Sequence, residues 1–202
     1  MTTLAVFHTL VSAEVNRGTD HDTAIISYTR RAARWIERNY SFSYMDNFAT
    51  GSLATTRTLS LPARLKKIDM FRIVDSDNEY SNLELIDPYQ LDSTESGEPT
   101  AYWYNADTTI YLDKTPEETY SYEMQRVQYT SWPTDTSQSP WLCENAEDAL
   151  LAQTIVMMKA LLKLDDKLVR DWEKLRDEGL RTLFLADQEM RQANRIEFIR
   201  YG

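Results

Sequence analysis

Residues 22–45, DTAIISYTRRAARWIERNYSFSYM, contain the change of periodicity that decides the fold. Up to Tyr40 the apolar side chains recur every three or four residues, which is the spacing of one face of an α-helix. Over residues 41–45 small and aromatic side chains alternate instead, which is typical of a β-strand. We therefore expect a helix that ends near Tyr40 and leads directly into a β-rich region.

The middle of the chain carries the pattern of several short strands. Its segments alternate in polarity or are rich in β-branched and aromatic residues, and turn-forming residues separate them. Residues 105–107, Asn-Ala-Asp, read as the tight turn of a hairpin. The expected strands are residues 57–61, 68–74, 100–105, 108–112 and 120–129.

Both ends of the chain show helical periodicity. Residues 4–15 place apolar side chains at helical spacing and precede Gly18, where a helix would end. In the last third, Asn145 is a favourable N-cap residue for a late helix. Residues 164–167 then predict a break, with Asp165 as the cap of the final helix.

These patterns predict an α+β fold, namely an antiparallel helical bundle from the N- and C-terminal helices with a β-rich central insertion. The expected domains are residues 1–40 (the N-terminal helices of the bundle), 41–142 (the acidic insertion) and 143–202 (the C-terminal helices and tail). In such a bundle the large side chains of the apolar faces should be largely buried; these are Trp35, Leu161 and Trp172.

Composition excludes several classes of protein. The 202 residues carry a net charge of −10, and residues 49–142 hold 15 acidic and 7 basic side chains. Such a surface disfavours tight wrapping of nucleic acid. The single cysteine, Cys143, excludes an internal disulfide framework, and the five scattered glycines exclude a phosphate-binding loop. We also find neither a secretion signal nor an apolar run of membrane-spanning length.

No catalytic constellation stands out. His8 and His21 are the only histidines, so any histidine-dependent nucleophile would have to use one of them. Asp75, Asp77 and Glu79 suggest a calcium loop, but the loop lacks the glycine and the final glutamate of an EF-hand. We therefore predict a protein without enzymatic activity, with no catalytic residues, no metal site and no cofactor.

Aromatic residues gather in one predicted hairpin. Alternation places Tyr102 and Tyr104 on one face of the strand and Trp103 on the other. A two-sided aromatic strand fits a core with cross-strand pairs, and it also fits a subunit interface or a sugar-stacking platform. These three aromatics are therefore candidate interface residues.

Three stretches of the sequence resemble head-to-tail adaptor proteins of tailed bacteriophages, also called head completion or tail tubular gatekeeper proteins. Residues 24–42, AIISYTRRAARWIERNYSF, resemble the family's second helix, which ends at an aromatic residue and enters a strand. The segment from TIYLDKTP at 109–116 to YSYEM at 120–124 resembles its strand, proline-bearing turn and strand. Residues 160–175, ALLKLDDKLVRDWEKL, resemble its late helix, acidic break and final helix with a tryptophan.

The resemblance implies a structural adaptor of the virion neck, made in the host cytoplasm. Its expected partners are the portal protein, tail or nozzle proteins, and further copies of itself in a ring of about twelve subunits that lines the DNA channel. DNA would pass without specific binding, and no membrane is involved. The acidic composition is compatible with this role, because an acidic lining lowers the affinity for the phosphates of DNA. Ring contacts need two different complementary faces on each subunit.

The end of the chain is the expected docking segment. Adaptors of this kind engage the portal through their C-terminal segment, and four of the last six residues before Gly202 are apolar. Burial of each such side chain contributes about 1.5–3 kcal/mol. The candidate portal- or subunit-interface residues are Arg191, Arg195, Ile196, Phe198, Ile199, Arg200 and Tyr201. Packing of this tail against its own subunit is the alternative.

A second function from another class stays open. The β-rich middle could be a carbohydrate- or receptor-binding module of a virion or tail protein. An exposed Trp103 would favour that module, whereas a buried Trp103 would favour the adaptor.

Overall fold

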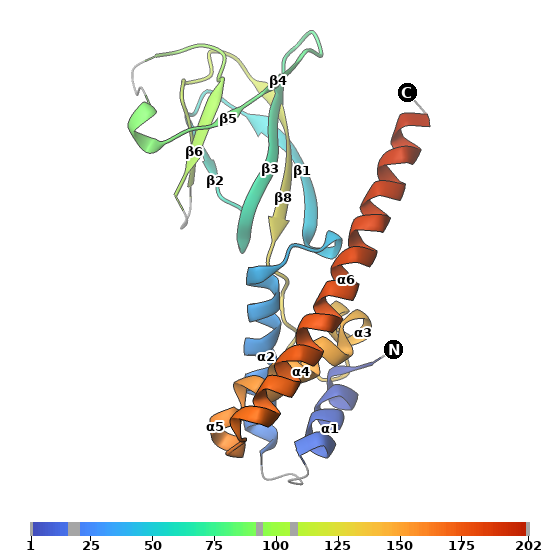
Figure 1. Cartoon of the computed structure of the whole chain (residues 1–202). Coiled ribbons are helices and arrows are strands. Elements are labelled where there is room, and N and C mark those ends of the chain that lie inside the picture. Colours follow the sequence, from blue (N-terminus) through green and yellow to red (C-terminus); the bar gives the residue numbers. More distant parts are fainter. Residues whose placement is uncertain (1, 16–20, 92–94, 106–108, 201–202) are drawn as a thin grey trace. The chain divides into compact units, whose positions relative to one another are not determined.

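The computed structural model describes residues 2–15, 21–91, 95–105 and 109–200, with side chains up to Gln192 in the last helix. It divides into two compact units (Figure 1). The helical unit comprises Met1–Tyr44 and Ser131–Gly202, and the β unit comprises Met45–Thr130.

The helical unit is arranged around one largely buried helix. Helix α4 packs against the helices α1, α2 and α6, and six of its eleven residues are buried. Burial on several sides explains why α4 lacks a polar face, since Asp148 is its only exposed residue. The helices are α1 (Leu4–Val15), α2 (Asp22–Asn39), α3 (Trp141–Asn145), α4 (Glu147–Met157), α5 (Lys159–Leu162) and α6 (Asp166–Arg200).

Local sequence signals set the boundary between α5 and α6 but not the start of α4. The predicted break at residues 164–167 is confirmed, because Lys163 adopts the left-handed conformation with φ of 53° and ends α5. Asp165 caps α6, as predicted: its Oδ1 accepts a hydrogen bond of 2.8 Å from the backbone N–H of Leu168. The predicted cap at Asn145 is wrong. Its side-chain amide donates to the carbonyl of Trp141 instead, so α4 begins without a side-chain cap.

The β unit contains two four-stranded sheets. The first has the order β1-β8-β3-β4 and is antiparallel throughout; the second has the order β2-β7-β6-β5, in which β5 runs parallel to β6. The strands are β1 (Asp46–Leu53), β2 (Thr58–Ser60), β3 (Leu65–Val74), β4 (Tyr80–Asn82), β5 (Glu84–Leu85), β6 (Ala101–Tyr104), β7 (Thr109–Leu112) and β8 (Tyr120–Gln128).

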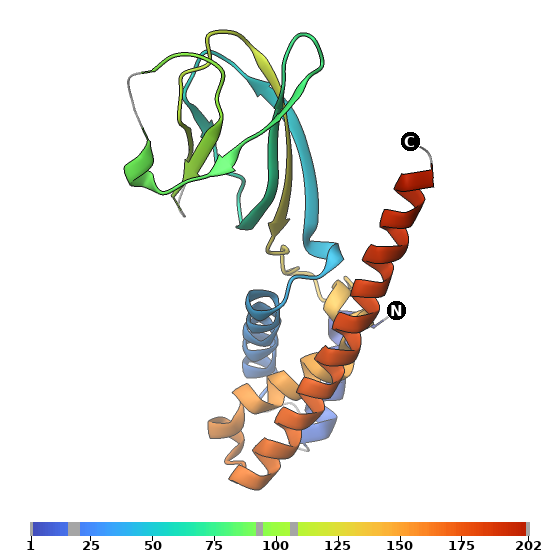
Figure 2. The same ribbon diagram turned by 45° about the horizontal axis from the view of Figure 1, so that its top comes forward.

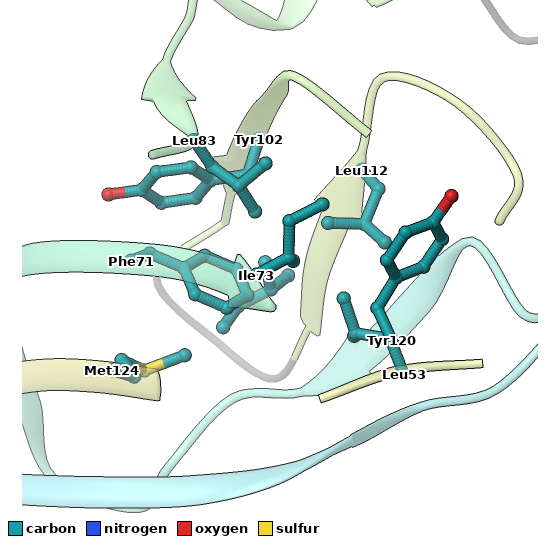
Figure 3. Packing of buried hydrophobic residues seen from close by; sticks show 9 residues of the cluster. Leu53, Phe71, Ile73, Leu83, Tyr102, Leu112, Tyr120 and Met124 are labelled. Atoms are coloured by element: carbon teal, nitrogen blue, oxygen red, sulfur yellow. The ribbon is translucent and has the colours of Figure 1, made fainter. Parts of the chain in front are cut away.

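Both sheets contribute to one apolar core (Figure 3). Phe71 from β3 meets Tyr102 from β6 edge to face, with ring centroids 5.1 Å apart. Leu112 and Tyr120 lie beside Leu53 in the same cluster. The unit is thus held together by apolar contact between the sheets, with the charged side chains of the strands outside the core.

The strand prediction for residues 41–45 is wrong. Ser43–Met45 form a short 3-10 helix, η1, and the strand begins only at Asp46. The reason is that the backbone N–H of Ser43 bonds to a carboxylate, that of Asp187, rather than to a neighbouring strand. Strand β1 was not predicted because its residue pattern is weak and includes Gly51. A Cβ at Gly51 would lie 2.6 Å from the ring of Tyr122, so any other residue here requires that ring to move.

The predicted fold class, an antiparallel helical bundle with a β-rich insertion, is also wrong. Two four-stranded sheets with their own core make the middle of the chain an architecture in itself. The helices range from 4 residues in α5 to 35 in α6, and such unequal lengths cannot cover one another as bundle helices do. For the same reason Trp35, Leu161 and Trp172 are half-buried rather than largely buried.

Candidate assembly surfaces

The predicted docking segment is the continuation of a single long helix. Helix α6 runs without interruption to Arg200 and extends past the other helices of the helical unit (Figures 1 and 2). Leu185 and Met190 are exposed on it. Tyr201 lies outside the described residues, as do the side chains of Arg195, Ile196, Phe198, Ile199 and Arg200.

Arg191, the first residue of the predicted segment, binds within its own subunit. Its Nε donates to Asp187 at 2.8 Å, and its guanidinium also donates to the carbonyl of Ser41 at 3.2 Å. The same Asp187 carboxylate accepts from the backbone N–H of Ser43 at 2.8 Å and from its hydroxyl at 2.5 Å. We call this group of Ser41, Ser43, Asp187 and Arg191 the Asp187 clasp.

The electrostatics of the clasp favour the ionised carboxylate. Asp187 is only 3% exposed, and burial by itself would raise its pKa. The hydrogen bonds from Ser43 and Arg191 outweigh burial and hold the pKa of Asp187 below its usual value. The clasp therefore fixes α6 to the segment that follows α2 over the pH range in which Asp187 is charged.

A stack of aromatic rings lies around the same segment. Phe42 is completely buried between Tyr40 and Tyr44, and Tyr44 stacks on Trp141 at 4.1 Å between ring centroids. The hydroxyl of Tyr44 donates to the buried Glu37. Burial, followed by the charge of Glu37, raises the pKa of Tyr44 far above its usual value. Tyr44 therefore stays neutral and acts as a hydrogen-bond donor.

The aromatic residues of the hairpin divide between the core and the surface. Tyr102 is buried against Phe71, and Tyr104 stacks on Tyr102 from the same face, as alternation predicted. Trp103 is half-buried on the other face and stacks on Tyr111 at 5.4 Å. Its exposure is thus intermediate between the two values that would favour a binding module or an adaptor.

An exposed aromatic side chain lies on a short turn of the β unit. Tyr89 is 96% exposed in the 3-10 helix η2 (Pro88–Gln90), which follows β5 on the side of the β unit away from β1 (Figures 1 and 2). Asp87 and Gln90 hold this helix in a capping box, in which the Asp87 carboxylate accepts from the N–H of Tyr89 at 3.3 Å. We call residues 87–90 the Tyr89 turn.

The outer face of α2 is basic. Arg30, Arg31 and Arg38 are exposed, and Ile26 beside them is 41% exposed. Among the described residues, none of these three guanidiniums forms a salt bridge, although Arg31 lies over the ring of Tyr28 at 5.4 Å. The face is therefore positively charged in a protein whose total charge is −10.

Burial favours the neutral forms of the Cys143 thiol and the His8 imidazole. Burial raises the pKa of the Cys143 thiol to about 12 and lowers the pKa of His8. Asp75 accepts hydrogen bonds from the N–H groups of Asp77 and Glu79, so the acidic loop is a self-bonded turn. The part of the chain that the structure describes contains no group of three side chains suited to a metal ion. Nor does that part contain a helix with the length and apolar content needed to cross a membrane.

Sequence reasoning missed two features of these surfaces. Asp187 and Arg191 have the four-residue spacing of neighbours on a helix, but nothing in the sequence marks Ser43, 144 residues from Asp187, as their partner. The Tyr89 turn had a readable signal, because Asp87-Pro88 followed by Gln90 is a capping box with proline at its first position.

Comparison with known proteins gives a family match over nearly the whole chain. The family model described as SU10 adaptor protein matches residues 2–197. No curated protein matches. Among solved structures, a chain from the "Neck of empty GTA particle computed with C6 symmetry" is 14% identical, with 82% of this chain and 87% of that chain covered and a TM-score of 0.28. A score this low does not establish a common arrangement of the two chains.

Proposed function

Because this chain belongs to the SU10 adaptor family, we propose that it forms a ring in the neck of a tailed bacteriophage, between the portal and the tail and around the path of the DNA. Family membership confirms the resemblance to head-to-tail adaptors that residues 24–42, 109–124 and 160–175 predicted. It also makes the protein a structural component of the virion neck. The match over residues 2–197 is the observation that carries the proposal.

The charge distribution supports a position around DNA. The β unit holds 15 acidic and 7 basic side chains, a net charge of −8, whereas the helical unit has a net charge of −2. An acidic lining repels the phosphate backbone and lets DNA pass without being held. This role needs no catalytic chemistry.

The extended end of α6 supports a role in attachment to the portal. The helix continues for nine residues beyond Arg191, the last residue of the Asp187 clasp, and it exposes Leu185 and Met190. A helix that leaves its own subunit can insert into a groove of a partner. We propose that residues 192–202 are the portal anchor, with the clasp as the point where the anchor leaves the subunit.

The experiment is electron microscopy of the full chain mixed with purified portal rings. We expect a ring of adaptor density, of about twelve subunits, on one side of the portal. A chain that stays dispersed beside intact portals of its own phage would contradict the proposal.

Truncation tests the anchor separately. A chain that ends after Gln192 retains Arg191 and the whole clasp, so it should keep its circular dichroism spectrum and lose attachment to the portal. A matched control, Lys174→Ala in the full chain, changes an exposed side chain of α6 outside the anchor and should attach. Attachment of the truncated chain with unchanged affinity would show that the anchor lies elsewhere.

A further inference from the structure

We propose that the Tyr89 turn of one copy docks on the basic outer face of α2 in the next copy. The inference rests on the proposed ring and names the two faces that would form its subunit contact. The β unit exposes an acidic and aromatic surface at the Tyr89 turn, and the helical unit exposes a basic surface on α2.

The Tyr89 turn has the properties of an interface anchor. Tyr89 is 96% exposed although tyrosine is among the side chains that dominate interface energetics, and Leu85 beside it is 52% exposed. Pro88 and the capping box hold the turn before any partner arrives. A rigid turn loses little conformational freedom on binding, which favours affinity.

The surroundings of the turn select a basic partner. Residues 75–98 contain eight acidic side chains and neither lysine nor arginine. Glu84 and Asp87 of this segment flank Leu85 and are exposed. Complementary charge steers two surfaces together and discourages wrong partners.

The outer face of α2 in another copy of the same protein provides the basic, exposed surface that the Tyr89 turn requires. Ile26, Arg30 and Arg38 fall on one side of the helix, and Arg31 borders them at helical spacing. A shallow hollow at the start of α2 is lined by Ser27, Tyr28 and Arg31 on the side of this face, and by the residues of the first turn, which include the carboxylate of Asp22. A tyrosine ring fits such a hollow beside a guanidinium, because arginine stacks well on aromatic faces.

The two faces belong to different units of the chain, so their contact between copies is heterologous. A contact of this kind closes into a ring when the rotation between subunits permits it. A self-complementary contact would produce a two-fold dimer instead. The proposed pairing therefore has the symmetry that a neck ring requires.

Cross-linking between copies tests the contact. Two full-length variants, Tyr89→Cys and Ser27→Cys, are mixed and treated with a short bis-maleimide; the native Cys143 is buried and does not compete. We expect a cross-linked dimer of the two variants at a rate at least about tenfold above that of Tyr89→Cys mixed with Lys174→Cys, a control on exposed α6. A rate equal to the control, or faster linkage of Tyr89→Cys to itself, would overturn the proposal.

Charge reversal gives a second measurement. Arg30→Glu with Arg31→Glu in the Ser27→Cys chain should slow cross-linking about tenfold, and Glu84→Lys in the Tyr89→Cys chain should restore the rate. Lys174→Glu and Glu117→Lys, also exposed, should change it less than twofold. No slowing on reversal would contradict the role of the basic face.

The outcomes separate this inference from the proposed function. Rings on the portal without specific cross-linking would leave the neck role intact and overturn the contact. Specific cross-linking without rings would support the contact and overturn the ring. The doubly substituted chain Ser27→Cys/Tyr89→Cys checks for contact inside one copy: fast linkage within dilute monomers would overturn the proposal.

Discussion

The two units of this protein use polar side chains in opposite ways. In the described part of the chain, every buried polar or charged side chain belongs to the helical unit: Thr29, Glu37, Gln153, Thr154 and Asp187. The β unit buries an apolar and aromatic cluster and keeps its acidic residues at the surface. The helical unit therefore makes specific polar contacts inside its core, whereas the polar contacts of the β unit, such as Arg72 with Glu123, lie at the edge of an apolar core.

Buried polar contacts restrict the internal arrangement of a unit, whereas surface charge acts on its partners. A buried hydrogen-bonded carboxylate adds little net stability, but it penalises every arrangement that leaves it unpaired. The clasp and the pair Arg176–Gln153, with a bond of 3.0 Å, thus restrict how α6 lies against its neighbours. The β unit makes its side-chain contacts outside the apolar core, for example from Arg57 to the carbonyl of Leu112, and its many acidic residues can direct partners.

The most damaging change should be in the β unit. Phe71 is 2% exposed and meets two other rings, so Phe71→Ala removes contacts that the two sheets cannot restore. We expect a loss of about 3–5 kcal/mol of unfolding free energy. Hydrogen exchange resolved by segment should show increased exchange in Met45–Thr130 only. Equal exchange increases in the helices would mean that the units do not unfold separately.

Loss of the clasp should have the next largest effect. Asp187→Ala leaves Arg191 and Ser43 without their shared acceptor, and hydrogen bonds to a charged group contribute about 1.5–3 kcal/mol in total for such a site. Chemical denaturation followed by circular dichroism measures the loss. Asp171→Ala, an exposed aspartate of the same helix, is the control and should cost less than about 0.5 kcal/mol. A loss of unfolding free energy for Asp187→Ala as small as that of the control would show that the clasp does not stabilise the helical unit.

Overpacking at the crossing of α4 and α6 should cost somewhat less. A Cβ at Gly179 would lie 3.1 Å from the Cβ of Ala149, so the two helices meet there through small residues. Gly179→Leu should destabilise the helical unit by about 1–3 kcal/mol. Gly179→Ala should stay within about 1 kcal/mol of the wild type, because the gain in helix propensity opposes the tighter contact. A stable Gly179→Leu chain in thermal denaturation would show that α6 can move away from α4.

Acid should weaken the helical unit through Asp187. The pKa of this carboxyl is lowered in the folded state, so its contribution is complete above the unfolded value near 3.9 and is lost as the pH falls through the folded value. Asp187→Asn should therefore show a flatter dependence of unfolding free energy on pH below about 4. Parallel curves for the variant and the wild type would contradict the assignment.

The smallest effect on stability should come from Tyr89. Its ring is almost completely exposed, so Tyr89→Ala should change the unfolding free energy by less than about 0.5 kcal/mol. Thermal denaturation gives this number. A larger loss would mean that the Tyr89 ring packs against the β unit and contributes to its stability.

Local patterns predicted much of the secondary structure. The helices at residues 4–15 and 22–39 and the break before Asp166 follow from periodicity and capping, because these depend on neighbours in the sequence. The strands β3, β6, β7 and β8 lie where alternation placed them. Strand β1 was missed, since its position depends on pairing with the distant strand β8, in which Asp46 lies opposite Val127, and on the space at Gly51 for Tyr122.

The candidate surfaces were predicted less well than the elements. The aromatic residues of the hairpin were identified, but whether a ring is buried depends on which sheet lies opposite, and that is a tertiary property. Arg191 was expected at an interface, but its guanidinium forms hydrogen bonds within its own subunit, to Asp187 and to the carbonyl of Ser41. No local pattern reveals a contact that closes over 150 residues.

The length of α6 gives its clasp a mechanical consequence. At about 1.5 Å per residue, the stretch from Asp187 to Arg200 reaches about 20 Å beyond the last buried residue described in the helix. A stiff rod of that reach acts as a lever pivoted at the carboxylate, so a tilt of about 10° there displaces the tip by roughly 3–4 Å. The positional variation of the end of α6 is therefore set by how far the three short hydrogen bonds around Asp187 can vary in length and angle.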